Sequence, residues 1–269
     1  MIDRFLISSV AWQGVRHSEA IAQVRAAGFG GVEILCKPGH FEPGNRDYVE
    51  DALRGLDGWT DAEVTLHAPF YDVDLAATDA DGWSHAVREA MLALEAASRL
   101  KAGSMTIHVR SMTAAERWDG GNVEAFSRSL QRLIPAASER SVGLAVENFP
   151  PPYFTANERD LLGLIEGFPS VGTCIDTGHA HLAGRLVEIA RALAERALVA
   201  HLHDNSACGR DEHLIPGRGT IAWREFVEAM RGFRGRPVVE VGMTGTLGET
   251  LANVEKAIRE TGLEGLVGA

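Results

Sequence analysis

Eight short runs rich in Val, Ile, Leu and Thr alternate with segments of helical periodicity along this chain of 269 residues. The runs predicted as strands are Phe5–Val10, Gly31–Leu35, Glu63–His67, Ser104–Val109, Gly143–Glu147, Gly172–Asp176, Leu198–Leu202 and Val238–Val241. The segments in which apolar residues recur every three or four positions include Ser18–Ala27, Trp83–Leu100, Val123–Arg140, Leu186–Ala197, Trp223–Gly232 and Glu249–Thr261. Strand followed by helix, repeated along the chain, predicts parallel strands joined by helical crossovers.

Imidazole and carboxylate side chains decide between an open sheet and a closed barrel. Nine of them fall at or after the predicted C-terminal ends of successive strands: His67, His108, Glu147, Asp176, His179, His201, Asp211, His213 and Glu240. An open sheet gathers its ligands between two or three strands, whereas only closure brings this many strand ends to one mouth. We therefore predict an α/β fold over residues 1–269, a single (β/α)₈ TIM barrel with a metal site at the C-terminal face of its strands.

The donor atoms of these nine residues are imidazole nitrogens and carboxylate oxygens, with no Cys among them. Such a set suits Zn²⁺ or Mn²⁺ and not an iron–sulfur cluster. Glu147 and Glu240 each follow an apolar strand run directly and are expected to be buried. Because a buried carboxylate needs a cation or a hydrogen-bond donor beside it, a bound metal would supply the partner.

Two short segments place pairs of these residues together. In Asp176-Thr-Gly-His179 the turn at Gly178 would let both side chains face one mouth, although Asp is also a favoured helix N-cap. His201 and His203 share one strand face, because side chains alternate with period two. We predict His201 as the ligand, since it lies within the apolar run, and a supporting or solvent-facing place for His203.

The remaining candidates are weaker when each is considered alone. Asp211 and His213 lie on a glycine-containing loop where a surface Asp and His are common. His67 and His108 each end an apolar strand, where a lone His is more often a hydrogen-bonded structural residue than a ligand. Two equivalent placements in consecutive strands favour ligation.

Further residues are expected at the mouth of the barrel, where the default alternative is a solvated side chain. The predicted substrate-binding residues are Glu33, Lys37, Arg110 and Arg218. Arg110 and Arg218 would hold an anionic group, because guanidinium binds phosphate or carboxylate with two parallel hydrogen bonds. The aromatic residues that would either wall the pocket or belong to the core are Phe70, Tyr71 and Trp223.

Charge and cysteine content narrow the possible partners. A net charge of −11 with dispersed Lys and Arg repels a polyanion, so duplex DNA is a poor substrate, whereas a small phosphate stays possible beside bound metal ions. Three cysteines without paired spacing predict a reduced, cytoplasmic protein. No apolar stretch approaches the roughly 20 residues that span a bilayer, so we expect no membrane partner. The sequence leaves open whether the protein forms a homo-oligomer.

Five segments together resemble the xylose isomerase-like TIM-barrel superfamily, which contains sugar isomerases and epimerases, sugar-acid dehydratases and endonuclease IV-like phosphodiesterases. They are Val146–Asn148, Asp176–His179, His201–Asn205, Asp211–His213 and Pro216–Trp223. The resemblance covers essentially the whole chain and implies the barrel fold and a metal site.

Two kinds of site occur in this superfamily. Members that isomerise or epimerise sugars use one Mn²⁺, Mg²⁺ or Co²⁺, and the resemblance carries its ligands to Glu147, Asp176, His201 and Glu240, with the two glutamates moving protons. Endonuclease IV-like members use three zinc ions, with additional ligands corresponding to His67, His108, His179, Asp211 and His213. All five are present here.

The complete second set favours a hydrolase with two or three Zn²⁺ ions that cleaves a small phosphoester or phosphorylated sugar, with Glu147 bridging two ions. The alternative is a single-metal sugar or sugar-phosphate isomerase or epimerase, in which Glu147 and Glu240 form the acid–base pair. A third hypothesis is a catalytically silent sugar-phosphate-binding or metal-storage protein, because fold does not guarantee activity.

Overall fold

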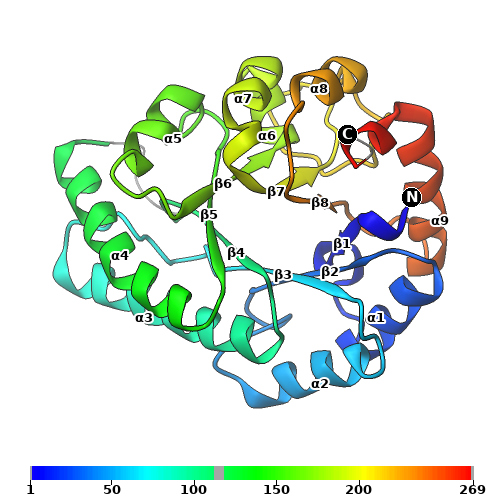
Figure 1. Cartoon of the computed structure of the whole chain (residues 1–269), viewed down its shortest axis with the longest axis horizontal. Helices are drawn as coiled ribbons and strands as arrows, with labels where there is room; N and C mark the ends of the chain where they lie inside the picture. Colours follow the sequence, from blue (N-terminus) through cyan, green and yellow to red (C-terminus); the bar gives the residue numbers. More distant parts are fainter. Residues whose placement is uncertain (1, 112–117, 268–269) are drawn as a thin grey trace.

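The computed structural model describes residues 2–111 and 118–267, and in this part of the chain eight parallel strands close into a barrel (Figure 1). The strands are β1 (Leu6–Ser8), β2 (Gly31–Leu35), β3 (Glu63–His67), β4 (Ser104–Ile107), β5 (Gly143–Glu147), β6 (Val171–Asp176), β7 (Ala197–Leu202) and β8 (Arg236–Val239). Each strand pairs with the next in sequence, and β1 pairs with β8 through Leu6 and Val238. The predicted closed barrel is confirmed.

Helices connect successive strands and form the ring outside the barrel in Figure 1. They are α1 (His17–Ala26), α2 (Arg46–Leu56), α3 (Ala80–Arg99), α4 (Gly120–Glu139), α5 (Glu158–Ile165), α6 (Thr177–Leu182), α7 (Leu186–Leu193), α8 (Trp223–Ala229) and α9 (Leu247–Thr261). Polar residues start several of them, since the side chains of Asn45, Asp79 and Thr246 accept backbone N–H bonds as N-caps of α2, α3 and α9. These caps satisfy backbone donors that the first helical turn leaves free.

The structure differs from the predicted element bounds where a polar residue interrupts a run. The first strand was predicted to continue to Val10 but ends at Ser8, whose side chain accepts the N–H of Val10 and caps a 3₁₀ helix. Strands β4 and β8 end at Ile107 and Val239. Consequently His108 and Glu240 lie one residue beyond the paired strand, at the start of a loop.

The barrel interior contains apolar side chains below the predicted ligands. A floor of apolar side chains includes four residues that stand two positions before a predicted ligand: Ala145, Cys174, Val199 and Val238. Because side chains alternate along a strand, the predicted ligand on each strand points to the same side as its floor residue and lies one layer higher. The larger apolar core fills the space between the strands and the outer helices.

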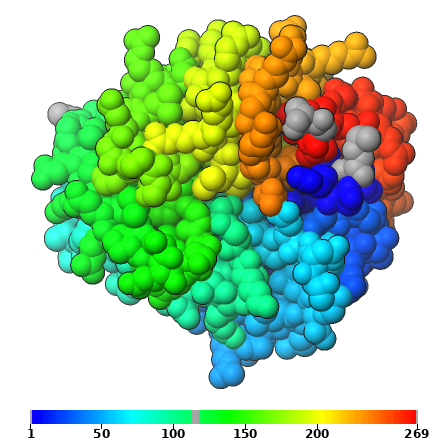
Figure 2. Space-filling model, in the orientation of Figure 1, coloured from blue at the N-terminus to red at the C-terminus, as the bar shows by residue number. Residues whose placement is uncertain are grey.

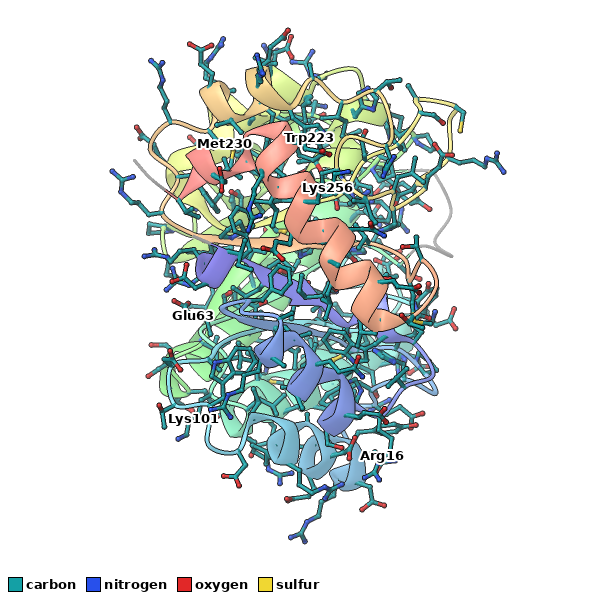
Figure 3. The ribbon with its side chains drawn as sticks, turned by 90° about the vertical axis from the view of Figure 1, so that its right-hand side faces the viewer. Arg16, Glu63, Lys101, Trp223, Met230 and Lys256 are labelled. Atoms are coloured by element: carbon teal, nitrogen blue, oxygen red, sulfur yellow. The ribbon has the colours of Figure 1, made fainter. Side chains whose placement is uncertain are left out.

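The two ends of the barrel carry different segments. In Figure 3, Glu63 and Lys101, at or before the starts of β3 and β4, lie toward one edge of the molecule, whereas Arg16, which follows β1, lies toward the other. Figure 2 shows the first and last segments, blue and red, side by side. No helix within the described ranges combines the length and apolar character needed to cross a membrane.

Candidate metal centre

The nine predicted ligands lie in one connected cluster at the C-terminal ends of the strands. The parallel register places Glu147 beside Cys174, and Asp176 beside His201. Seven of the nine are buried, and they are His67, His108, Glu147, Asp176, His179, His201 and Glu240. The side chains of Asp211 and His213, on the loop after β7, are 27% and 29% exposed. The side chains of all nine residues therefore converge as expected. That these nine residues bind a metal stays a prediction.

Glu147 lies at the centre of the cluster and faces imidazoles from several strands. Its Oε2 atom is 3.2 Å from Nε2 of His67 and 3.0 Å from Nε2 of His108. Its Oε1 atom is 3.2 Å from Nδ1 of His179 and 3.6 Å from Nδ1 of His201. Burial by itself raises the pKa of Glu147, but the neighbouring histidines hold that pKa well below its usual range. The carboxylate is therefore ionised, and each of its oxygens faces a different pair of rings.

Backbone carbonyls determine the ring tautomer of three histidines in the cluster. In His67, His179 and His213 the Nδ1 atom lies 2.9 to 3.0 Å from a main-chain carbonyl oxygen. Because a carbonyl oxygen only accepts hydrogen bonds, Nδ1 carries the proton in the neutral ring and Nε2 has a bare lone pair.

Each bare Nε2 atom faces a carboxylate oxygen. For His67 this is Oε2 of Glu147, at 3.2 Å. For His179 and His213 it is Oδ2 of Asp211, at 3.2 and 2.9 Å. Two acceptors lie at contact distance only when a proton or a cation is between them, so these pairs fit a metal ion.

The carboxylates that face these histidines also shift the pKa values of the rings. Burial lowers the pKa of a histidine, yet hydrogen bonds and charges from nearby carboxylates outweigh it. The net effect raises the pKa of His67, raises that of His179 well above its usual value and raises that of His213 to about 9. Without a metal, the nearby carboxylates favour the protonated form of these rings.

Three carboxylates approach one nitrogen of His201. Its Nδ1 atom lies 3.0 Å from Oε2 of Glu240, 3.6 Å from Oε1 of Glu147 and 3.8 Å from Oδ2 of Asp176. This buried nitrogen has no hydrogen-bond partner among the residues that the structure describes. An orphaned acceptor surrounded by carboxylates is the arrangement expected around a divalent cation.

Asp176 is the N-cap of α6, and its carboxylate also faces the cluster. Its Oδ1 atom accepts the backbone N–H of His179 at 2.7 Å, which caps α6. His203, which was predicted only to support or to meet solvent, is fully buried and has its Nε2 atom 3.0 Å from Oδ2 of Asp176. The position of His203 on the same strand face as His201 indicated that it could point toward the site. Its contact with Asp176 could not be predicted from the sequence.

Glu33 lies deeper in the barrel than the other predicted substrate-binding residues. Its side chain has no solvent exposure. It lies inside the barrel, where its carboxylate contacts Nε2 of His201 at 3.0 Å and accepts the hydroxyl hydrogen of Thr65 at 3.0 Å. Substrate binding by Glu33 stays a prediction.

The other predicted substrate-binding residues are closer to solvent. Arg110 forms an ion pair of 3.0 Å with Asp74 and lines a small cavity beside His108. Lys37 is partly exposed, and Arg218 is exposed on its loop. Binding of an anion by these three residues stays a prediction.

Aromatic rings form part of the wall around the imidazoles. The ring centroid of Phe70 is 5.0 Å from that of His67 and 4.6 Å from that of His108. Phe149, in the Pro-rich loop after β5, has its ring centroid 4.6 Å from that of His108. Trp223 is buried and donates its Nε1 hydrogen to Asp204. The ring of Tyr71 packs on Phe70 with centroids 4.5 Å apart.

Eight parallel strands with imidazoles and carboxylates gathered at their C-terminal ends define a TIM barrel with a candidate metal centre. A family model described as xylose isomerase-like TIM barrel matches residues 21–264. The chain therefore belongs to the xylose isomerase-like TIM-barrel family, and the resemblance drawn from the sequence is confirmed.

Relatives and solved structures agree with this family. An uncharacterized protein of Methanocaldococcus jannaschii is 24% identical and aligns with 95% of this chain and 86% of its own length. A probable endonuclease 4 of Thermoplasma volcanium is 27% identical over 64% of this chain and 65% of its own length. A D-tagatose 3-epimerase-like protein has a TM-score of 0.82 at 22% identity and 98% coverage of both chains. The IolI protein with a bound zinc atom has a TM-score of 0.80 at 16% identity, also with 98% coverage of both chains. At these identities the two structural likenesses establish the fold alone.

Proposed function

We propose that the protein is a metal-dependent hydrolase whose multinuclear zinc site cleaves a small phosphoester or phosphorylated sugar. The observation that supports this function is the set of bare imidazole nitrogens aimed at shared carboxylates. Glu147 faces the bare nitrogen of His67 and also contacts the rings of His108, His179 and His201. Asp211 faces the bare nitrogens of His179 and His213. A single cation cannot satisfy donor groups on both of these carboxylates.

Three donor groups would hold the ions: His67, His108 and Glu147; Glu147, Asp176, His201 and Glu240; and His179, Asp211 and His213. When bound, such ions act as Lewis acids that activate water and stabilise negative charge on phosphoryl oxygens. The contribution of the chain is to hold these donors on rigid strand ends. Phe70 and Phe149 pack against the imidazoles and limit the access of bulk water to the reacting groups. The likeness to a probable endonuclease 4 supports a phosphoester substrate.

A second candidate function is sugar epimerisation with one Mn²⁺, Mg²⁺ or Co²⁺. The observation that favours it is the approach of both Glu240 and Glu147 to Nδ1 of His201, at 3.0 and 3.6 Å. In this function one glutamate removes a proton from a substrate carbon and the other returns a proton to it. The likeness to a D-tagatose 3-epimerase-like protein supports a small sugar as substrate.

Metal content and two assays on the same preparation separate these functions. Protein purified without chelator is analysed for its elements, then tested for cleavage of bis(p-nitrophenyl) phosphate and for exchange of ketohexose C–H hydrogen with deuterated water. More than one equivalent of zinc with ester cleavage supports the hydrolase. One equivalent of Mn²⁺ or Mg²⁺ at full activity, with C–H exchange and no ester cleavage, overturns it in favour of the epimerase.

A further inference from the structure

Glu33 is a buried carboxylate beneath the candidate metal centre, on β2. Its Oε1 and Oε2 atoms lie 3.0 and 3.3 Å from Nε2 of His201, so the ring N–H points at the carboxylate. Thr65, the register partner of Glu33 on β3, donates its hydroxyl hydrogen to Oε2 at 3.0 Å. A buried carboxylate requires such donors, and here the imidazole and the hydroxyl both meet Oε2, while Oε1 has no hydrogen-bond partner among the described residues.

The ring of His201 is oriented in the opposite sense to the other cluster histidines. In His67, His179 and His213 a main-chain carbonyl accepts the Nδ1 hydrogen, and Nε2 faces the cluster. In His201 the Nε2 side faces Glu33, and Nδ1 faces the other carboxylates. Glu33 therefore stands where a backbone carbonyl stands for these three rings.

We propose that Glu33 is a positioning residue of the metal centre, which accepts the Nε2 hydrogen of His201 and thereby presents Nδ1 to a divalent cation. This inference rests on the metal centre of the proposed function, and it holds for the hydrolase and for the epimerase alike because both use His201. A carboxylate behind a ligating imidazole fixes its tautomer and increases the basicity of the opposite nitrogen.

The geometry separates this role from those of a ligand and of a catalytic residue. The two ring nitrogens of an imidazole point away from each other, so a cation at Nδ1 lies on the far side of the ring from Glu33. The Glu33 carboxylate has no solvent exposure and contacts the ring of His201 and the hydroxyl of Thr65. Its influence must act through the ring of His201.

Zinc affinity of the full-length protein tests the inference. Metal-free wild type and the variants Glu33→Ala, Glu33→Gln and His201→Gln are titrated with zinc in competition with a chromogenic chelator, and zinc content at saturation is measured by elemental analysis. Glu124→Gln, at an exposed position on α4, is the matched control. We expect Glu33→Ala to weaken one zinc equivalent about 10-fold to 100-fold without removing it. Glu33→Gln keeps an acceptor and should weaken it less, while His201→Gln should abolish it.

Each other outcome overturns the inference in a distinguishable way. Wild-type affinity in Glu33→Ala shows that Glu33 does not position His201. Loss of the zinc equivalent at saturation in Glu33→Gln shows that Glu33 is itself a ligand. Wild-type protein that binds no zinc overturns the proposed metal centre and this inference together.

A spectroscopic measurement decides the question even if Glu33→Ala does not fold. Zinc-loaded wild type labelled with ¹⁵N-histidine is examined by NMR, and the signals of His201 are assigned by their loss in His201→Gln. We expect a protonated Nε2 and a metal-bound Nδ1. The reverse tautomer would refute the positioning role.

Discussion

The ring of His203 stacks on the ring of His213 with centroids 4.1 Å apart and planes 13° apart. Both rings and Asp211 offer ligand atoms within 4.8 Å of one another, so proximity alone suggests a common ion. The lone pair of an imidazole nitrogen lies in the plane of its ring. Because these two ring planes are nearly parallel and displaced from each other, the two lone pairs cannot meet at one cation. We therefore propose that His179, and not His203, shares an ion with Asp211 and His213, because Nε2 of His203 already contacts Asp176.

Replacement of Asp211 by Asn tests this third donor group. The variant removes the charge that faces the bare nitrogens of His179 and His213, so we expect zinc content to fall by one equivalent. The rate of ester cleavage should decrease about 10-fold to 100-fold, which is the range for changes beside metal ligands. Elemental analysis and kinetics check this, with Asp61→Asn at an exposed position as control. Unchanged zinc content would show that Asp211 does not bind zinc.

Replacement of Glu147 by Gln should have a larger effect on metal content than any change on the loop. Both oxygens of Glu147 face imidazoles, and they belong to two proposed donor groups. An amide offers one acceptor oxygen and no charge, so we expect the loss of more than one zinc equivalent. Elemental analysis beside Glu139→Gln, on the exposed face of α4, provides the comparison. A loss of one equivalent or less would argue against a bridging Glu147.

Removal of metal should lower thermal stability. Ions that bind only the folded chain stabilise it by about 2.7 kcal/mol when present at 100 times their dissociation constant. For a chain of this size, that corresponds to a decrease in Tm of roughly 5 to 10 °C after dialysis against a chelator. Calorimetry before dialysis, after it and after addition of ZnCl₂ measures the effect. A Tm that is the same in all three samples would contradict a folded metal centre.

His40 should make the stability of the metal-free protein dependent on pH. Burial, together with the nearby His17 and Lys37, lowers the pKa of His40 from 6.5 to about 4. Between these values the unfolded chain binds a proton that the folded chain does not, so the free energy of unfolding decreases as pH falls from about 6.5 toward 4.

The variant His40→Gln removes this titration and isolates its contribution. From pH 7 to pH 4, wild type should lose on the order of 2 to 3 kcal/mol more stability than the variant. Urea unfolding of both metal-free proteins at several pH values measures the difference. Parallel pH profiles for the two proteins would show that His40 titrates normally in the folded state.

Gly178 should tolerate no side chain. A Cβ atom added there would lie 2.0 Å from Cε1 of His203, and that ring is held by Asp176. We expect Gly178→Ala to reduce the free energy of unfolding by about 1 to 3 kcal/mol, as overpacking does. Gly163→Ala, on α5 with open space around its Cα atom, should instead stabilise its helix by up to about 1 kcal/mol. Urea unfolding of both variants distinguishes the two outcomes.

The order of strands and helices could be predicted from the sequence, because the spacing of apolar residues reflects the local geometry of the backbone. The placement of Glu147, Asp176 and His201 at one rim also followed from the sequence, since parallel strands in a barrel all end at the same face. The helices α2, α5 and α6 were not among the predicted segments, whereas the short helices α7 and α8 were, so helix length alone does not explain which were found.

The tertiary structure alone decided which atom faces which. Glu33 and His201 are 168 positions apart, and nothing in the local sequence indicates that one accepts a hydrogen bond from the other. The carbonyl partners that leave Nε2 of His67 and His213 bare depend on loop conformations that no residue pattern encodes. Local spacing determines which face of a strand a side chain occupies, whereas its ring orientation and partners depend on packing between segments that meet only in the folded chain.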